Sequence, residues 1–451
     1  MDKKLPFKSY FAIGLMLFAL FFGAGNLIFP AQLGQYAGTN LLPAAIGFLV
    51  TGVGLPLLGI LAMGFSGSRD LQDLAGRVHP AYGIFFTVLL TLTIGPFFAI
   101  PRTGTVAFEV GISPFVSESG IQTALFIFTL VFFVAVLLFS LNPAKLVDNV
   151  GKILAPALVV LLAILLITAF VNPMGPMQSP EEGYASNAFM TGFLEGYNTM
   201  DALAALVFGI IVINAVKSLG ISSRKEVLSA TAKSGVIATI FLGVIYVGIA
   251  YLGSISTGTL GLFDNGGPVL SGAASHYFGT FGSVLLAVMI ILACLTTAIG
   301  LIISCAEYFH KLLPKFSYKT LVVFFTTISF IIANFGLTNI ITFSIPVLMF
   351  LYPLAVVLML LTFLSPLFNH ARIVYVTTIG VTFLIAIIDG LKTLCGSLGI
   401  DYFGWMVPII NFYENVLPMY NQGLGWIVPA IIVIVITGVI ARVQKVNVQE
   451  A

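Results

Sequence analysis

Long apolar stretches recur from one end of this chain to the other. Each has about twenty residues, enough for a helix to cross about 30 Å of hydrocarbon. The chain of 451 residues is 59% hydrophobic and 8% charged, with a mean hydropathy of +1.10, which leaves too little polar surface for a water-soluble globule. Because the apolar runs are continuous and do not alternate, a β-barrel is excluded. The sequence predicts an all-α polytopic membrane protein with twelve transmembrane spans, at 9–31, 40–65, 80–108, 121–141, 146–171, 193–216, 228–254, 281–308, 318–336, 339–364, 371–391 and 424–442.

Basic residues are concentrated in alternate connections between these spans. If the N-terminus is cytoplasmic, only Arg102 and Lys392 fall on the outer half. This asymmetry follows the positive-inside rule, so we expect a cell-membrane protein with both termini in the cytoplasm. The lysines before the first span imitate a signal peptide, but no small-residue cleavage motif follows, and we interpret the stretch as a retained span. The basic residues assigned to the inner side are Lys3, Lys4, Lys8, Arg69, Arg77, Lys145, Lys152, Lys217, Arg224, Lys225, Lys233, Lys311, Lys315, Lys319, Arg372, Arg442 and Lys445.

The sequence contains none of the common motifs of enzymes or metal sites. Its three cysteines and four histidines show no spacing typical of a metal centre or a disulfide framework. No nucleotide-binding, nucleophile-elbow or metalloprotease motif is found, so we expect no cofactor, no enzymatic activity and no nucleic-acid partner. A channel would need a continuous polar lining, and an intramembrane enzyme would need convergent titratable groups; the scattered polar residues favour neither.

The longest outer connections are 172–192, 255–280 and 392–423. The second contains the turn signal Asn265-Gly266-Gly267-Pro268, and the third is rich in aromatic residues. The second and third are either short helical lids or ordinary loops.

The first apolar stretch is interrupted near its middle by Gly23-Ala24-Gly25-Asn26, within the phrase FALFFGAGNLIFP. A helix that stops inside the bilayer leaves peptide groups without hydrogen-bond partners, which is costly in hydrocarbon. The two glycines do not form a GxxxG packing face, and Asn26 needs a polar partner at this depth. In transporters built from inverted repeats, a substrate or a coupling ion binds at such breaks. We therefore expect a binding site here.

Two other spans carry features that would match this break. If the chain contains two five-span halves, spans 1 and 6 run in opposite directions. Span 6 carries Phe208-Gly209 near its middle, where the glycine either weakens the helix or forms a packing notch. Span 8 places Ala293, Thr296 and Thr297 near mid-depth. The two hydroxyls either bond back to carbonyls one turn earlier or complete a cation site with carbonyls freed in span 1.

Three short motifs stand in spans 1, 5 and 8. They are FFGAGNLIFP, GKxLxP at 151–156 and AxxTT at 293–297. Together with the evenly spread spans, they resemble the branched-chain amino acid:cation symporters of the BrnQ type, over essentially the whole chain. That family is related to the LeuT-fold amino acid transporters, which implies a 5+5 inverted repeat with broken helices 1 and 6. The implied units are 1–171, 172–364 and an appended 365–451, and the implied function is import of leucine, isoleucine and valine coupled to Na+ or H+ by alternating access.

The resemblance also implies roles for single residues. The substrate carboxylate would meet the amides near Ala24 and Gly25, at the positive end of a half helix. The substrate ammonium would face carbonyls freed in both broken spans, and Phe208 would close over the ligand. The implied substrate-binding residues are Leu20, Phe21, Gly23, Ala24, Gly25, Asn26, Ala205, Phe208 and Gly209. The implied Na+ ligands are oxygens of Ala19, Phe22, Ala293, Thr296 and Thr297.

Three charged residues are candidates for gating or coupling. Arg102 in span 3 and Asp201 in span 6 are an unlike pair at membrane depth. They either face the same vestibule, or each of them snorkels or pairs with a local partner. Lys152 at the start of span 5 either replaces the cation, which would make transport proton-coupled, or anchors the span at the cytoplasmic interface. The threonine pair in span 8 favours Na+. Another neutral amino acid or a nucleobase remains an alternative solute, and the oligomeric state is left open.

Overall fold

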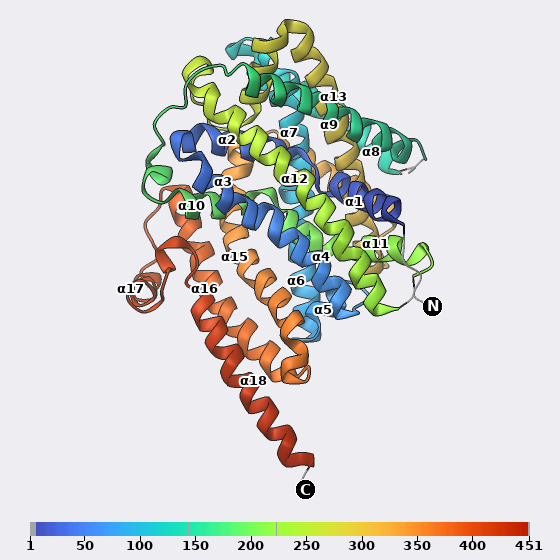
Figure 1. Ribbon diagram of the computed structural model, residues 1–451, viewed down its shortest axis with the longest axis vertical. Coiled ribbons are helices and arrows are strands. Elements are labelled where there is room, and N and C mark those ends of the chain that lie inside the picture. The colour runs from blue at the N-terminus through green and yellow to red at the C-terminus, as the bar shows by residue number, and fades with distance from the viewer. Residues whose placement is uncertain (1–5, 142–144, 222, 450–451) are drawn as a thin grey trace.

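The computed structural model describes residues 6–141, 145–221 and 223–449, and every regular element in these ranges is helical (Figure 1). Eight helical segments of this part are long and apolar enough to cross a membrane, and four shorter apolar helices accompany them. The prediction of an all-helical, multi-pass membrane protein is therefore confirmed. The helices are α1 (Phe7–Phe21), α2 (Ala24–Ala37), α3 (Leu41–Leu49), α4 (Leu55–Ser66), α5 (Leu71–Ala75), α6 (Pro80–Leu92), α7 (Ala99–Gly111), α8 (Ile121–Leu141), α9 (Lys145–Val171), α10 (Glu182–Glu195), α11 (Asp201–Ser218), α12 (Arg224–Leu260), α13 (Gly267–Leu312), α14 (Tyr318–Ala333), α15 (Leu337–Leu364), α16 (Arg372–Leu398), α17 (Met406–Val416) and α18 (Ile427–Gln449).

Several predicted spans are built from two helices each. Span 1 is α1 and α2, and span 6 is α10 and α11 with the 3₁₀ turn η6 (Gly196–Thr199) between them. Spans 2 and 3 each contain a π-helical turn, η2 (Val50–Gly54) between α3 and α4 and η3 (Thr93–Phe97) between α6 and α7. The predicted start of span 6, at 193, is wrong, because α10 begins earlier, inside the stretch expected to be a loop.

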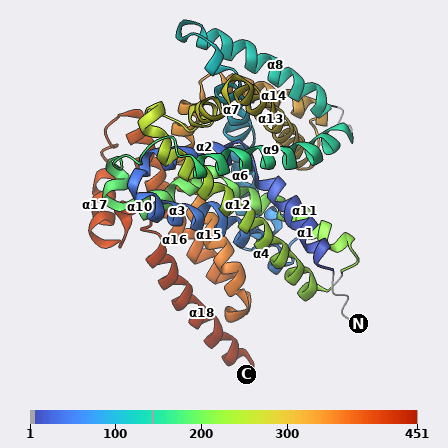
Figure 2. The same ribbon diagram turned by 45° about the horizontal axis from the view of Figure 1, so that its top comes forward.

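The helices form two groups that contact each other through the core. Helices α1, α2, α4, α11 and α12, which belong to spans 1, 2, 6 and 7, contact one another. Helices α7, α8, α13 and α14, from spans 3, 4, 8 and 9, form the second group, at the top of Figure 2. Helix α9 contacts α12 and α13, whereas α15 contacts α4 and α7, so spans 5 and 10 link the two groups.

Three connections meet at one end of the bundle. The backbone N–H of Thr39, between spans 1 and 2, donates to the carbonyl of Gln178, between spans 5 and 6, at 3.0 Å. The hydroxyl of Thr259, at the end of span 7, donates to the carbonyl of Met174 at 2.9 Å. The connections after spans 1, 5 and 7 therefore share one face, the one predicted to be outside.

Three other connections meet at the opposite end of span 2. Arg372, which begins span 11, donates from Nε to the carbonyl of Val78, between spans 2 and 3, at 2.9 Å. Arg442, near the end of span 12, donates to the carbonyl of Leu367, between spans 10 and 11. These segments are the ones predicted to face the cytoplasm, so their grouping agrees with the expected alternation of connections.

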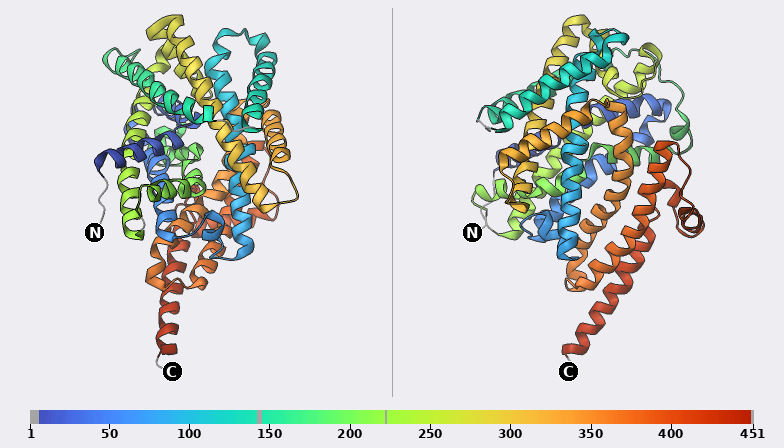
Figure 3. Two further views of the ribbon diagram at one scale, coloured as in Figure 1. Left: turned by 90° about the vertical axis from the view of Figure 1, so that its right-hand side faces the viewer. Right: turned by 180° about the vertical axis from the view of Figure 1, so that it is seen from behind.

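The last three helices lie at the side of the two groups. Helix α16 packs against α15 and α18, and α18 extends away from the bundle toward the C-terminus (Figure 3). Helix α17 covers the outer end of α16 through buried side chains that include Ile388, Met406 and Ile410. The outer connections are expected from the sequence to be either short helical lids or ordinary loops. Residues 406–416 form a helix, which agrees with the first alternative. The first alternative also agrees with 267–278, which a left-handed Gly279 (φ +62°) separates from the rest of α13.

Candidate functional site

The first break lies where the sequence predicted it. Helix α1 ends at Phe21, and extended backbone at Gly23 (φ −119°, ψ −170°) separates it from α2. The N–H of Gly23 donates to Oδ1 of Asn26 at 3.1 Å. The carbonyl of Ala19 therefore loses the N–H that would continue the helix, and the last turn of α1 presents carbonyls that the helix itself cannot satisfy. The side chain of Leu20 is exposed, so only its carbonyl can take part in a site at the break.

The second break lies elsewhere than predicted. Helix α11 runs without interruption through Phe208-Gly209, and the chain turns at Met200, which adopts a left-handed conformation (φ +63°). A non-glycine residue in this region costs about 1–3 kcal/mol, a strain that proteins retain mainly at functional sites. The interruption of span 6 is therefore at Gly196–Met200, directly before Asp201. Of the two alternatives for Gly209, a weakened helix or a packing notch, the structure contradicts the first and agrees with the second.

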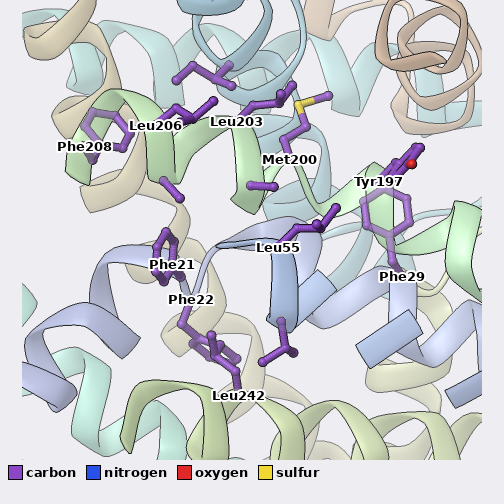
Figure 4. Close-up of a cluster of buried hydrophobic side chains, with 14 of the residues drawn as sticks. Phe21, Phe22, Phe29, Leu55, Tyr197, Met200, Leu203, Leu206, Phe208 and Leu242 are labelled. Carbon is purple, nitrogen blue, oxygen red and sulfur yellow. The ribbon is translucent and has the colours of Figure 1, made fainter. Parts of the chain in front are cut away.

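Helix packing accounts for Ala205, Phe208 and Gly209, the residues that the sequence placed near the break in span 6. A Cβ at Gly209 would lie 3.0 Å from Cγ of Met63, so this glycine is a notch that receives α4. Ala205 is fully buried, and its Cβ would lie 2.9 Å from a Cβ at Gly59 of α4. Its carbonyl lies within α11, so the break does not free it for an ammonium group. Phe208 is buried in the same apolar cluster as Phe21 (Figure 4).

A buried polar cluster joins the two breaks. Nδ2 of Asn26 donates to Oδ2 of Asp201 at 2.6 Å, and the hydroxyl of Tyr246 in α12 donates to the same oxygen at 3.0 Å. Asn26 also contacts the hydroxyl of Tyr246. All three side chains are at most 4% exposed. The polar partner that Asn26 required is therefore the first residue of α11, together with a tyrosine that the sequence did not single out.

Arg102 lies beside the same two breaks. Its guanidinium donates from Nη1 to the carbonyl of Asn198, inside the span 6 break, at 2.6 Å, and from Nη2 to the hydroxyl of Ser344 at 3.3 Å. It also lies over the ring of Phe29 in α2, 4.9 Å from the ring centroid. Arg102 and Asp201 thus flank one site. They form no ion pair, since the described residues contain only the pairs Arg69–Asp73 and Lys392–Glu414. The side chain of Lys152 lies outside the described residues.

The threonine pair of span 8 lies beside the break in span 1. A Cβ at Gly23 would lie 3.9 Å from Cγ2 of Thr297. The hydroxyls of Thr296 and Thr297 both donate to the carbonyl of Ala293, each at 2.9 Å. This is the local bonding that the sequence left as one alternative. It uses the hydroxyl protons and leaves the oxygen lone pairs available to a cation, whereas the Ala293 carbonyl is already occupied.

Two further irregular segments support the site, and the sequence analysis missed both. The π-helical turn η2 lies against the span 6 break, where the hydroxyl of Thr51 donates to the carbonyl of Phe193 at 2.6 Å. The turn η3 contains Gly95 in a non-helical conformation (φ −105°, ψ −125°), followed by Pro96. A Gly-Pro pair inside an apolar span is a signal that a helix bends there, and it was present in the sequence.

Apolar side chains close around the breaks. Phe21, Phe22 and Met200 belong to one buried cluster, drawn in Figure 4. A cavity of about 10 Å³ borders Phe21 between α1, α4 and α12, which is too small for an amino acid. Binding of an amino acid beside Phe21 therefore requires these helices to move apart.

Discontinuous helices that meet at buried polar groups in a multi-pass helical bundle define a membrane transporter of the broken-helix type. The chain belongs to the branched-chain amino acid transport protein family, whose profile matches residues 7–444. The branched-chain amino acid permease BrnQ of Bacillus subtilis is 49% identical over 432 residues, which cover 96% of each chain. The permease BraB of the same organism is 47% identical over 432 residues, covering 96% of this chain and 95% of the relative. The family and these relatives are transporters and not enzymes.

Solved structures show the same fold. The inward-facing conformation of Mhp1 is similar with a TM-score of 0.60 and 14% identity, covering 97% of this chain and 91% of that chain. MhsT in complex with L-phenylalanine is similar with a TM-score of 0.57 and 16% identity, covering 95% of this chain and 97% of that chain. The likeness identifies the fold as that of the LeuT-type transporters.

Proposed function

We propose that this chain is a secondary active symporter that imports leucine, isoleucine and valine by alternating access. The observation that carries the proposal is the place of the span 1 break. Asn26 ties it to Asp201 at the span 6 break, and Gly23 lies next to Thr297 of span 8. Charged and polar groups of three spans therefore converge where a polar ligand binds in this class of transporter. The choice of solute rests on the relatives, which are branched-chain amino acid permeases.

Na+ is the coupling ion that we propose. The oxygens of Thr296 and Thr297 and the carbonyls at the end of α1, including those of Ala19 and Phe22, are neutral dipoles of the kind that coordinates a hard cation. If one threonine hydroxyl rotated so that it no longer donates to the Ala293 carbonyl, that carbonyl would be free to act as a further ligand. Coupling to H+ through Lys152 is the alternative. The cation and the amino acid would then bind at one shared site. Coupling follows because both stabilise the same arrangement of the broken span 1.

The proposed movement is a rocking of spans 1, 2, 6 and 7 against spans 3, 4, 8 and 9. Contacts within each of these groups, with spans 5 and 10 between them, support this division. The proposed topology has twelve crossings, a 5+5 inverted repeat and both termini in the cytoplasm. The clustering of Arg372 and Arg442 with the connections after spans 2 and 10 supports the inner face. The units 1–171, 172–364 and 365–451 end where α9 and α15 end, which supports the proposed boundaries.

Counterflow of labelled leucine in proteoliposomes tests the proposal. Vesicles loaded with unlabelled leucine should take up the label, and excess isoleucine or valine should compete, whereas phenylalanine and uracil should compete poorly. In vesicles without internal leucine, an inward Na+ gradient should drive accumulation and a pH gradient alone should not. Absence of leucine exchange would overturn the transport proposal. Accumulation driven by the pH gradient alone would overturn the choice of Na+ and favour H+.

A further inference from the structure

Arg102 is a buried cation without a carboxylate partner. Its side chain is 2% exposed, and its Nε has no hydrogen-bond partner among the described residues. Its direct contacts among the described residues are a backbone carbonyl, a serine hydroxyl and an aromatic ring, all of them neutral. A buried guanidinium held only by neutral dipoles is costly within a membrane, and such residues commonly mark a substrate pathway. A planar fork of donors is suited to a carboxylate.

The guanidinium lies at the first turn of α2. A Cβ at Gly25 would lie 3.5 Å from Nη1 of Arg102, so the absence of a side chain at Gly25 lets the guanidinium lie close to the backbone of this turn. The first N–H groups of α2, including those of Ala24 and Gly25, have no carbonyl one turn earlier in their own helix. They also carry the positive end of the helix dipole. Two independent sources of positive potential therefore meet at one point.

A purely structural role accounts for only part of this arrangement. Arginine commonly caps the last carbonyls of a helix, and Nη1 does this at Asn198 after α10. A cap requires one donor and leaves Nε and the charge of Arg102 without a function. Asp201 lies near enough to interact with the charge of Arg102, but it forms no ion pair with it, and its Oδ2 accepts from Asn26 and Tyr246. Glu195 accepts from the side chain of Asn198 at 2.8 Å and forms no ion pair with Arg102.

We propose that Arg102 binds the α-carboxylate of the transported amino acid, together with the amides of Ala24 and Gly25. This inference rests on the proposed function and adds to it the residue that requires a carboxylate in the substrate. The open Nε and one Nη supply a bidentate contact. Asp201, on the other side of the span 6 break, supplies negative charge toward the ammonium end of the zwitterion.

Ligand-induced thermal stabilisation of the purified protein tests this assignment with leucine and with leucinamide, which keeps the side chain and ammonium but lacks the carboxylate. The wild-type protein should bind leucine much more tightly than leucinamide. In Arg102→Gln, the affinity for leucine should fall by about 10- to 100-fold, while the affinity for leucinamide stays unchanged. Arg102→Lys should keep an intermediate preference, because it retains the charge without the fork. If Arg102→Gln does not fold, the Arg102→Lys variant alone tests the assignment.

Arg77→Gln is the matched control. Arg77 donates from Nη2 to the carbonyl of Ser66, the last residue of α4, at 2.6 Å and contacts neither break, so its loss should leave the preference for leucine unchanged. The inference is overturned if Arg102→Gln keeps the preference for leucine over leucinamide. Equal losses for both ligands would also overturn it, because they indicate a structural cap. A wild-type protein that leucine does not stabilise would instead contradict the proposed function.

Discussion

Asn26 and Asp201 hold the two helix breaks together. The Asn26 amide uses both of its ends: Oδ1 accepts from the N–H of Gly23 at 3.1 Å, and Nδ2 donates to Oδ2 of Asp201 at 2.6 Å. One side chain thus caps the gap in span 1 and anchors the start of the second half of span 6. A movement that separates the half helices α2 and α11 would break this bond. The pair is therefore placed to report the state of the site.

Asn26→Ala should lower both stability and transport. The substitution leaves the N–H of Gly23 without its acceptor and the Asp201 carboxylate without one of its donors, at a cost of about 1–3 kcal/mol. The midpoint of thermal unfolding and the rate of leucine counterflow measure the two effects. Asn339→Ala is the control, because the Asn339 amide bonds only to the carbonyl one turn earlier, on the surface of α15. Equal behaviour of the two variants would contradict the bridging role.

Thr297→Ala should weaken the dependence of transport on Na+. The loss of one coordinating oxygen should raise the Na+ concentration for half-maximal leucine uptake by about tenfold or more, since a single good ligand is worth about 1.4 kcal/mol or more. Uptake measured across a series of Na+ concentrations gives this value. Thr327→Ala is the control. The Thr327 hydroxyl donates to the carbonyl of Val323 one turn earlier, on the exposed surface of α14, so its loss should leave the Na+ dependence unchanged. An unchanged Na+ dependence in Thr297→Ala would exclude this hydroxyl from the ion site.

Sequence reasoning located the first break because its signal is local. Gly23, Gly25 and Asn26 within an apolar run break the helix pattern, and the conformation at Gly23 fits that pattern. The second break carries no such signal. It falls at Met200 (φ +63°), and methionine has no preference for a left-handed conformation, so the residue type gives no warning of a break. Gly209 attracted attention in its place, although it serves the contact with Met63. A glycine in a span does not by itself distinguish a packing notch from a break.

Gly253→Ala should destabilise the protein strongly. A Cβ at Gly253 of α12 would overlap the carbonyl oxygen of Ala31 in α2, so the two helices must separate. Overpacking of this kind typically costs about 1–3 kcal/mol. The yield of folded protein in detergent and its thermal midpoint measure the effect. Gly300→Ala is the control, because no atom apart from the adjacent backbone of its own helix lies within 4 Å of a Cβ at that position, and it should behave like the wild type. Similar midpoints for the two variants would contradict the close contact of α2 and α12.

Cysteine labelling should reveal the proposed orientation. The three native cysteines are at most 2% exposed, so the wild type should react little with a membrane-impermeant maleimide. Leu398→Cys, at the outer end of α16, should react in intact cells. Leu313→Cys, just after α13, should react only after the membrane is permeabilised. Both positions are more than 40% exposed. The reverse pattern would invert the topology.

Contacts between distant spans limited what the sequence could give at the site. Thr296 and Thr297 were recognised from their own motif, and the structure places Thr297 beside Gly23. Tyr246 was not recognised, because a tyrosine within an apolar span is ordinary until its hydroxyl is seen to face Asp201. Arg102 was singled out by its charge alone. Its neighbours, the carbonyl of Asn198 and the ring of Phe29, depend on how three spans pack.

The central claim is that the cation and the amino acid stabilise one arrangement of the broken span 1. Equilibrium dialysis on the purified protein tests it directly, by measuring the Kd for leucine with and without saturating Na+ and the Kd for Na+ with and without saturating leucine. We predict that each ligand tightens binding of the other by the same factor, about fivefold or more, because coupling between two sites is reciprocal. A Kd for leucine that is the same in Na+ and in choline would contradict the account.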